Sequence, residues 1–126
     1  MEYPYLNAIL DAEGAEFYRT FRRWQPRDLV PVLYSRRLLD DVEARYQKLE
    51  AAEDELQTLK RAADYIRILR RMRLTLRRAK FAWRADDLVF IQSIAEMYVD
   101  FGTVLQMLKV DQARGILPPP SEQTGV

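Results

Sequence analysis

Apolar residues recur along most of this chain at steps of three and four, the spacing that places side chains on one face of an α-helix. The signal is strongest over residues 57–84, which we expect to form one long helix. The apolar face of that segment comprises Ala62, Tyr65, Ile66, Leu69, Met72, Leu76, Ala79 and Trp83. Alternation of apolar and polar residues, the pattern of a half-buried strand, is not found over any useful length. The pattern therefore predicts an all-α protein.

Three further segments show the same helical spacing. Residues 5–24 predict one or two short helices joined near Gly14. A second helix is predicted from about Asp28 to the low fifties, with its apolar face formed by Val32, Leu33, Leu38, Leu39, Val42, Tyr46 and Leu49. A last helix should start after Asp86 or Asp87, since either side chain is suited to cap a helix N-terminus. The apolar face of that helix comprises Ile91, Ile94, Ala95, Tyr98, Phe101, Leu105 and Leu108.

Glycine and proline indicate where these elements end. Neither occurs between Pro31 and Gly102, but a helix of that length far exceeds the three or four turns usual in a small domain. We therefore expect a bend or short loop near residues 51–57. After Gly115 the sequence Ile-Leu-Pro-Pro-Pro-Ser cannot continue a helix and predicts an extended segment. The expected architecture is an antiparallel bundle of about four main helices over residues 1–114, with a proline-rich linker or tail over residues 115–126.

The composition excludes several classes of chemistry. Cysteine and histidine are both absent, so disulfides, thiolate or imidazole metal sites, and Ser-His-Asp or Cys-His catalysis are excluded. Two groups of acids have no nucleophile or base beside them, and they fit helix caps and ion-paired surfaces better than an acid–base pair. They are Asp40, Asp41 and Glu43, and Asp86 and Asp87. We therefore expect no enzymatic activity, no metal and no cofactor.

The charge is unevenly distributed along the chain. The net charge is +1, yet residues 60–84 carry ten basic side chains and one acid, Asp64. On the predicted helix, one basic row beside the apolar face comprises Arg70, Arg73, Arg77, Lys80 and Arg84. Such a row suits the phosphates of a nucleic acid. It equally suits the acidic end of the preceding helix, within the chain or across a subunit boundary, and we favour this second interpretation because the net charge is so small. Arg73, nearest the apolar face, should be partly buried and paired with a carboxylate.

Five aromatic residues are candidates for an interface. They are Phe17, Tyr18, Phe21, Trp24 and Trp83. Aromatics at helical spacing more often belong to a core, and we expect this of the first four. Trp83 lies at a predicted helix end, where both core and interface positions are consistent with the sequence.

One known family resembles this chain over roughly residues 14–120. The resemblance is carried by a short aromatic segment, an arginine-rich helix, a helix with acidic and aromatic residues, and a proline linker. These are Glu16-Phe17-Tyr18-Arg19; Ala63-Asp64-Tyr65-Ile66-Arg67-Ile68-Leu69-Arg70-Arg71-Met72-Arg73; Phe90, Glu96, Met97, Tyr98 and Phe101; and Pro118-Pro119-Pro120. The chain is similar to the helical domain of GINS subunits, the replication-fork scaffold of archaea and eukaryotes, in the type with the helical part first. In that family a small β-domain would begin just after the position of Pro120, so contacts made through it are in doubt here.

The resemblance implies a non-enzymatic role as an oligomeric assembly subunit. It would join a sister GINS-like subunit in a tetramer that bridges the MCM helicase and a RecJ-like partner. Two alternatives remain open from the residues alone: a nucleic-acid-binding bundle that uses the basic row, and a viral or phage structural or packaging subunit.

The sequence also indicates a compartment. No apolar run approaches the ~20 residues of a membrane span, and the N-terminus lacks a basic start followed by an apolar segment. We therefore expect a cytoplasmic protein. The resemblance would place it at the nucleoid of an archaeon or in the nucleus of a eukaryote.

Overall fold

The computed structural model describes residues 3–12 and 36–117, and the architecture over these residues is all-α, as predicted. A short N-terminal helix occupies residues 4–12. It is followed by α2 (Arg36–Ala51), α3 (Glu53–Gln57), α4 (Ala62–Ala82) and α5 (Asp87–Ala113). No strand occurs in these two ranges. The predicted aromatics Phe17, Tyr18, Phe21 and Trp24 lie outside the described residues.

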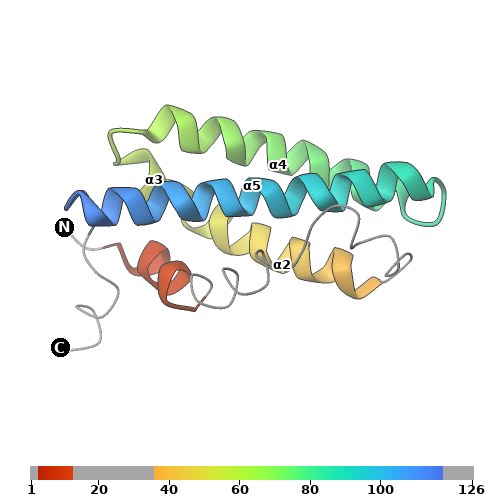
Figure 1. Ribbon diagram of the computed structural model, residues 1–126, viewed down its shortest axis with the longest axis horizontal. Helices are drawn as coiled ribbons and strands as arrows, with labels where there is room; N and C mark the ends of the chain where they lie inside the picture. Colours follow the sequence, from red (N-terminus) through yellow and green to blue (C-terminus); the bar gives the residue numbers. More distant parts are fainter. Residues whose placement is uncertain (1–2, 13–35, 118–126) are drawn as a thin grey trace.

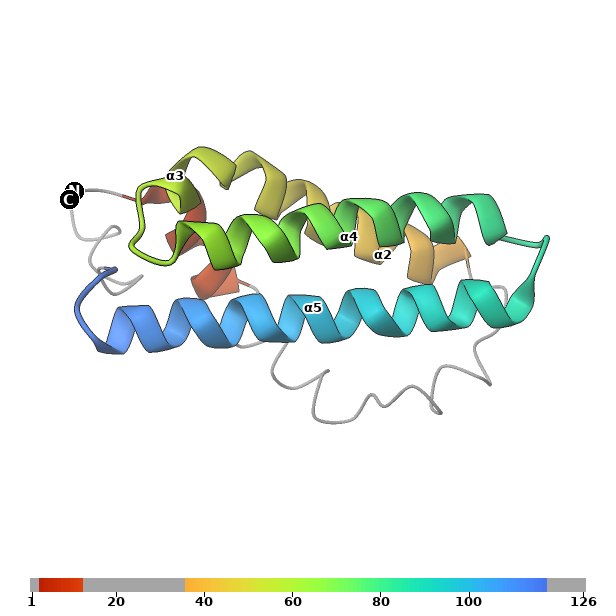
Figure 2. The same ribbon diagram turned by 90° about the horizontal axis from the view of Figure 1, so that it is seen from above.

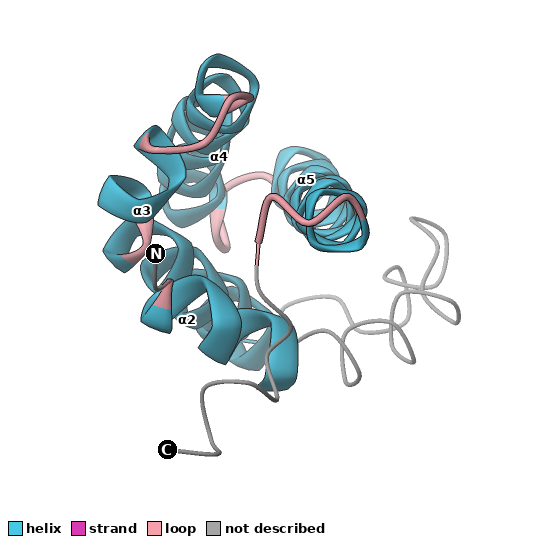
Figure 3. Ribbon diagram, turned by 90° about the vertical axis from the view of Figure 1, so that its left-hand side faces the viewer, coloured by secondary structure: helices cyan, strands magenta, loops and turns pink. Residues whose placement is uncertain are grey.

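The long helices surround one core. α4 and α5 run antiparallel side by side, and α2 lies across the other side of both (Figures 1 and 2). Viewed end-on, α2, α4 and α5 stand around a common centre (Figure 3). The apolar faces predicted for these helices meet there: Leu39, Met72 and Ile94, one from each helix, are fully buried. Packing of the apolar faces of three helices against one another forms the core of the described part of the chain.

A turn joins α4 to α5, and it shortens the predicted third helix. We expected that helix to reach Arg84, but α4 ends at Ala82. Trp83 is extended (ψ 121°) and Arg84 takes a left-handed φ of 66°. The amides of Ala85 and Asp86 donate to the Ala82 carbonyl oxygen, which closes the turn. The prediction failed here because the reversal is made by ordinary residues, without the glycine that usually occupies a positive φ.

Of the two candidate caps, Asp86 and Asp87, it is Asp86 that caps α5. It lies in extended backbone geometry, and its carboxylate accepts a hydrogen bond from the Val89 amide at 3.2 Å. This satisfies an amide that has no partner inside the helix.

The C-terminus of α5 is closed by a Schellman motif. Gly115 has a φ of +76°, its amide donates to the Gln112 carbonyl at 3.0 Å, and the Ile116 amide donates to the Asp111 carbonyl at 2.9 Å. The positive φ explains the glycine at this position. The next residue, Leu117, is 1% exposed and belongs to the core. The packed part of the chain therefore includes the first residues of the segment that the sequence assigned to the tail.

The bend between α2 and α3 lies within the predicted interval, but the turn before α4 covers residues 58–61, where the sequence predicted helix. α2 ends at Ala51, Ala52 is fully buried, and α3 occupies five residues before the turn that leads to α4. The Ala52 amide is shared between the carbonyls of Lys48 and Leu49. No glycine or proline causes this bend, so the contacts of α3 with the rest of the bundle must hold it.

α5 is apolar enough, by length and composition, to cross a membrane. It has 27 residues and a stretch with a mean hydropathy of 1.4, which the sequence interpretation did not count as a span. Within the bundle, 56% of that stretch is buried. A core helix packed on several sides has the same composition, so this property alone is weak evidence for a membrane.

Glu55 of α3 caps the N-terminal helix from a distance of some fifty residues along the chain. Its two carboxylate oxygens accept hydrogen bonds from the amides of Tyr5 (3.2 Å) and Leu6 (2.9 Å). Pro4, at the first helical position, has no amide to satisfy. The carboxylate therefore serves as an N-cap supplied by another helix, at the positive end of the helix dipole.

Removal of this cap should loosen the N-terminal helix. We expect Glu55→Ala to lower the free energy of unfolding by about 1–2 kcal/mol, and Glu55→Gln by less, because an amide retains one acceptor. Urea unfolding measures both changes, and hydrogen exchange at the Tyr5 and Leu6 amides should accelerate. The neighbouring exposed Asp54 provides a matched control: Asp54→Ala should remain within about 0.5 kcal/mol. Equal losses for Glu55→Ala and Asp54→Ala would contradict the cap.

Candidate functional site: the basic faces of helix α4

Basic side chains lie along α4 on both flanks of its buried face and on the side that faces away from the bundle. Its buried residues include Tyr65, Leu69, Met72 and Leu76 of the predicted apolar face, and Ile68 and Thr75 beside them. The arginines and lysine then divide into those that contact α2, those that contact α5, and those that face away from the bundle. The predicted basic row is therefore not one functional unit.

Arg73 contacts α2, and it has the carboxylate partners that the sequence predicted. Its Nε donates to Tyr46 Oη at 2.8 Å, and its Nη2 lies 3.5 Å from Glu50 and 3.9 Å from Glu53. The hydrogen bond with Tyr46 and the neighbouring carboxylates raise the pKa of Arg73. The side chain lies where α4 and α2 meet at the surface, and 46% of it is exposed.

Tyr46 links this pair to the core. Its ring is buried, and its hydroxyl donates to Glu50 at 2.8 Å while it accepts from Arg73. Burial, with a smaller contribution from Glu50, raises the pKa of Tyr46 above its ordinary value of 10.0. The hydroxyl therefore stays protonated and available as a donor near neutral pH.

Lys80 forms the second contact with α2. Its Nζ lies 2.6 Å from Glu43, whose side chain is 25% exposed. Arg73 and Lys80 therefore pair with acidic residues of the preceding helical segments, as the favoured interpretation of the basic row predicted. Pairs as exposed as these contribute little to stability, but they occupy two of the five residues predicted for the basic row.

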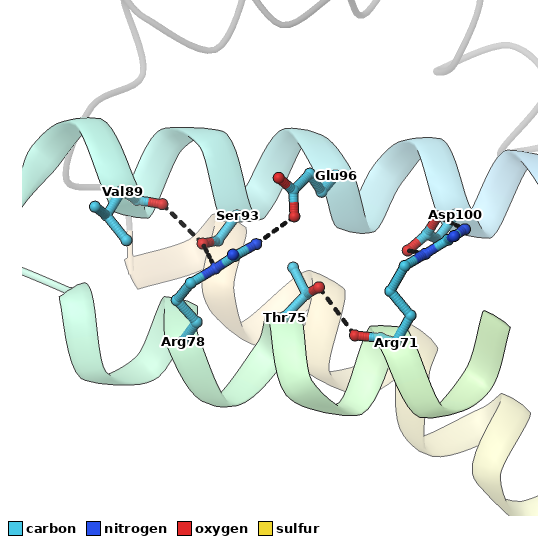
Figure 4. Close-up of polar contacts among 7 residues, drawn as sticks. All are labelled: Arg71, Thr75, Arg78, Val89, Ser93, Glu96 and Asp100. Carbon is cyan, nitrogen blue, oxygen red and sulfur yellow. Dashed lines mark hydrogen bonds and ion pairs between the residues drawn. The ribbon is translucent and has the colours of Figure 1, made fainter. Parts of the chain in front are cut away.

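Arg71 contacts α5, and the sequence analysis missed it. Its Nη2 and Nε donate to the two carboxylate oxygens of Asp100 at 2.7 and 3.2 Å (Figure 4). Asp100 is 5% exposed, so this paired geometry neutralises a carboxylate inside the α4–α5 contact. The hydrogen bond with Asp100 raises the pKa of Arg71.

Arg78 repeats the arrangement two turns further along α4. Its Nε donates to Ser93 Oγ at 3.1 Å, and its Nη2 pairs with Glu96 (Figure 4). Ser93 in turn donates to the Val89 carbonyl at 2.7 Å. The signal in the sequence was a second polar row at steps of three and four within the most apolar helix, formed by Ser93, Glu96 and Asp100.

A buried carboxylate joins the far ends of α4 and α5. Asp111 is fully buried, and it accepts a hydrogen bond from the Tyr65 hydroxyl at 2.5 Å and from Arg61 at 3.3 Å. Tyr65 is itself only 1% exposed. Burial first, and then the adjacent Asp111, raise the pKa of Tyr65. This cluster therefore links the start of α4 to the end of α5.

Three of the five acids that could have formed a catalytic pair have other partners. Asp41 accepts from the Tyr98 hydroxyl at 2.5 Å and from Arg45 of its own helix at 3.2 Å. Glu43 pairs with Lys80, and Asp86 caps α5. Within residues 3–12 and 36–117, no group of three acidic, cysteine or histidine side chains is placed to hold a metal ion.

The outward face of α4 differs from the other two. Arg70 and Arg77 are exposed and form no ion pair with any residue that the structure describes. Between and beyond them, Leu74 is 64% exposed and Phe81 is 86% exposed. Large apolar side chains flanked by unpaired arginines are typical of surfaces that contact another molecule.

The last two predicted site residues lie in the turn after α4. Arg84 stacks its guanidinium over the Trp83 ring, 4.3 Å from the ring centroid. Trp83 is partly buried and packs against the core. The structure therefore places Trp83 at the edge of the core, and separates Arg84 from the helical row in which the sequence placed it.

These features define an all-α bundle in which buried polar groups form hydrogen bonds between helices. The outer face of α4 carries exposed basic and apolar side chains. No protein-family model, curated protein or solved structure matches the chain. The resemblance to GINS subunits thus stays a prediction from the sequence.

Proposed function

We propose that this chain is a non-enzymatic assembly subunit that holds other proteins, in the manner of the helical domain of a GINS subunit. The observation that carries the proposal is the outer face of α4, where Leu74 and Phe81 are exposed between arginines. When a partner covers exposed apolar groups of this size, the free energy of the system falls, which favours the complex. The arginines would select partners of opposite charge.

The interior of the bundle supports a structural role. The carboxylates of Asp41, Asp100 and Asp111 each accept hydrogen bonds from another helix. Satisfied polar groups at the helix contacts make a bundle rigid and fix its packing. A rigid surface loses less entropy when it binds a partner.

Two of the four features that carry the GINS resemblance lie in α4 and α5, while the aromatic segment and the proline linker lie outside the described residues. The arginine-rich segment from Ala63 to Arg73 is the first half of α4, and Glu96 and Tyr98 of α5 contact α4 and α2. In this proposal the partners are a sister GINS-like subunit, an MCM helicase and a RecJ-like protein.

Light scattering coupled to size-exclusion chromatography tests the proposal. We expect the purified chain to be oligomeric, or to form a complex of defined mass with the MCM helicase or the RecJ-like protein of the same organism. A monomer that associates with neither protein at concentrations of about 50 μM would overturn the proposal, because such a subunit would lack even weak assembly contacts.

A nucleic-acid-binding bundle is the second candidate. The observation in its favour is that Arg70 and Arg77 are exposed without a described carboxylate partner, and that Arg84 lies nearby in the turn. This function predicts DNA affinity that falls steeply with salt and is removed by Arg77→Glu combined with Arg84→Glu. Flat binding curves at low salt would exclude it.

A further inference from the structure

The outer face of α4 carries a second periodic row, opposite its buried face. The row steps by four and three along the helix: Ala63, Arg67, Arg70, Leu74, Arg77 and Phe81. All six residues are exposed. The eighteen helical steps from Ala63 to Phe81 span about 27 Å. Steps of three and four are the spacing at which one helix packs lengthwise against another.

The composition of this row indicates the charge of the helix that would fit it. Leu74 and Phe81 are seven residues apart and offer two apolar contacts on the same line. Arg70 and Arg77, also seven apart, lie beside them. Arg67 lies 3.5 Å from Asp64, but both side chains are so exposed that this ion pair would compete only weakly with the carboxylates of a partner. A partner helix must therefore be acidic along the edges of its own apolar face.

A groove continues the row at its N-terminal end. It lies between α3 and α4 and has a volume of about 600 Å³. Its lining includes Ala63, Arg67 and Arg70 of the row, together with Ile66 and Glu53. A bulky apolar side chain of a helix lying along α4 can enter this groove at Ile66, with arginines at its rim. The groove and the row thus form one continuous surface.

We propose that this surface binds an acidic amphipathic helix of a partner protein, with apolar residues at heptad spacing and flanking carboxylates. This inference rests on the proposed function, and it adds the charge and the secondary structure of the partner segment that binds α4. Leu74 and Phe81 would interrupt the phosphate contacts of duplex DNA, so they favour a protein. A second copy is disfavoured because the exposed part of α2 carries Arg37 and Lys48 among its acids and matches the row poorly.

A labelled synthetic helix tests the proposal. The probe is a peptide of about 21 residues with leucine at positions a and d and glutamate at positions e and g of each heptad. We expect fluorescence anisotropy to show saturable binding to the full chain. Arg70→Glu combined with Arg77→Glu should weaken binding at least about tenfold, since it places like charges in contact. The same variant should gain affinity for the peptide with lysine in place of glutamate.

Matched controls separate this face from general charge effects. Arg37→Glu combined with Arg114→Glu changes the net charge equally at two exposed positions, one on α2 and one in the turn after α5, and should leave peptide binding unchanged. Leu74→Ser combined with Phe81→Ser should abolish binding without changing the melting temperature, because both side chains are exposed. Equal weakening by the two pairs of charge reversals would overturn the proposal. So would tighter binding to duplex DNA or to anionic phosphatidylserine vesicles, or a dimer that Phe81→Ser dissolves.

The outcomes distinguish this proposal from the proposed function. If the chain assembles with other proteins but the acidic helix does not bind, the docking face lies elsewhere and the assembly role stands. If the chain binds the acidic helix but forms no complex with MCM or RecJ-like proteins, the GINS-like role fails and the docking surface stands.

Discussion

Leu69→Ala is expected to destabilise the protein by about 2–5 kcal/mol, because it leaves a cavity in the centre of the bundle. Leu69 is 2% exposed and lies on the face of α4 that packs into the core with Met72. The surrounding helices are fixed by polar contacts on both flanks, so they cannot close over the missing side chain easily. Chemical unfolding of the two proteins, followed by circular dichroism, gives the difference directly.

A surface substitution provides the comparison for this result. Glu53→Ala should change the free energy of unfolding by no more than about 0.5 kcal/mol. The Glu53 carboxylate lies 3.9 Å from Arg73, at the outer limit of an ion pair. Similar losses for Leu69→Ala and Glu53→Ala would mean that the wrong face of α4 has been placed inside.

Tyr65→Phe is expected to cost about 1–3 kcal/mol, although it removes a single oxygen atom. The Tyr65 hydroxyl donates to Asp111 at 2.5 Å, and both residues are buried. Without that donor, a buried carboxylate loses a hydrogen bond that water cannot replace. Arg61 remains as its other described side-chain partner at 3.3 Å. A Tyr65→Phe protein as stable as the parent would show that the bond contributes nothing.

The same residue predicts how stability changes at alkaline pH. Burial raises the pKa of Tyr65 in the folded protein above the ordinary value of 10.0, which the unfolded chain retains. Above about pH 10 the unfolded state therefore releases a proton that the folded state keeps, and stability falls as pH rises, by up to about 1.4 kcal/mol per pH unit for one group. Tyr65→Phe removes this contribution, so the stability difference between the variant and the parent should shrink between about pH 9 and pH 11. A difference that stays constant would contradict the raised pKa.

The sequence predicted those parts of the fold that depend on periodicity and local chemistry. The apolar face of α4 repeats at steps of three and four over 21 residues, and its members Tyr65, Leu69, Met72 and Leu76 are buried. Asp86 caps α5 because a short acceptor before an apolar run can satisfy the first free amides of a helix. These features require only neighbouring residues.

The features that were missed depend on residues far apart in the chain. Arg71 was one of ten basic residues in its segment, and only its position opposite Asp100 distinguishes it from Arg70. In the sequence, Glu55 does not differ from the acids beside it. Only the structure shows that its carboxylate contacts the N-terminal helix. Ile68 and Thr75 are buried because α4 contacts α5 over a broad area. The apolar stripe in the sequence does not show how wide that contact is.

The long-range cap at Glu55 has a consequence for how the chain folds. α4 and α5 are consecutive and joined by a short turn, so their contact closes a small loop and can form early. The N-terminal helix receives its cap only after α3 has been positioned, and this requires closure of a loop of about fifty residues. We therefore expect the α4–α5 hairpin to nucleate folding and the N-terminal helix to dock last. On a ribosome, that helix would be synthesised before α3 and would lack its cap until α3 has emerged.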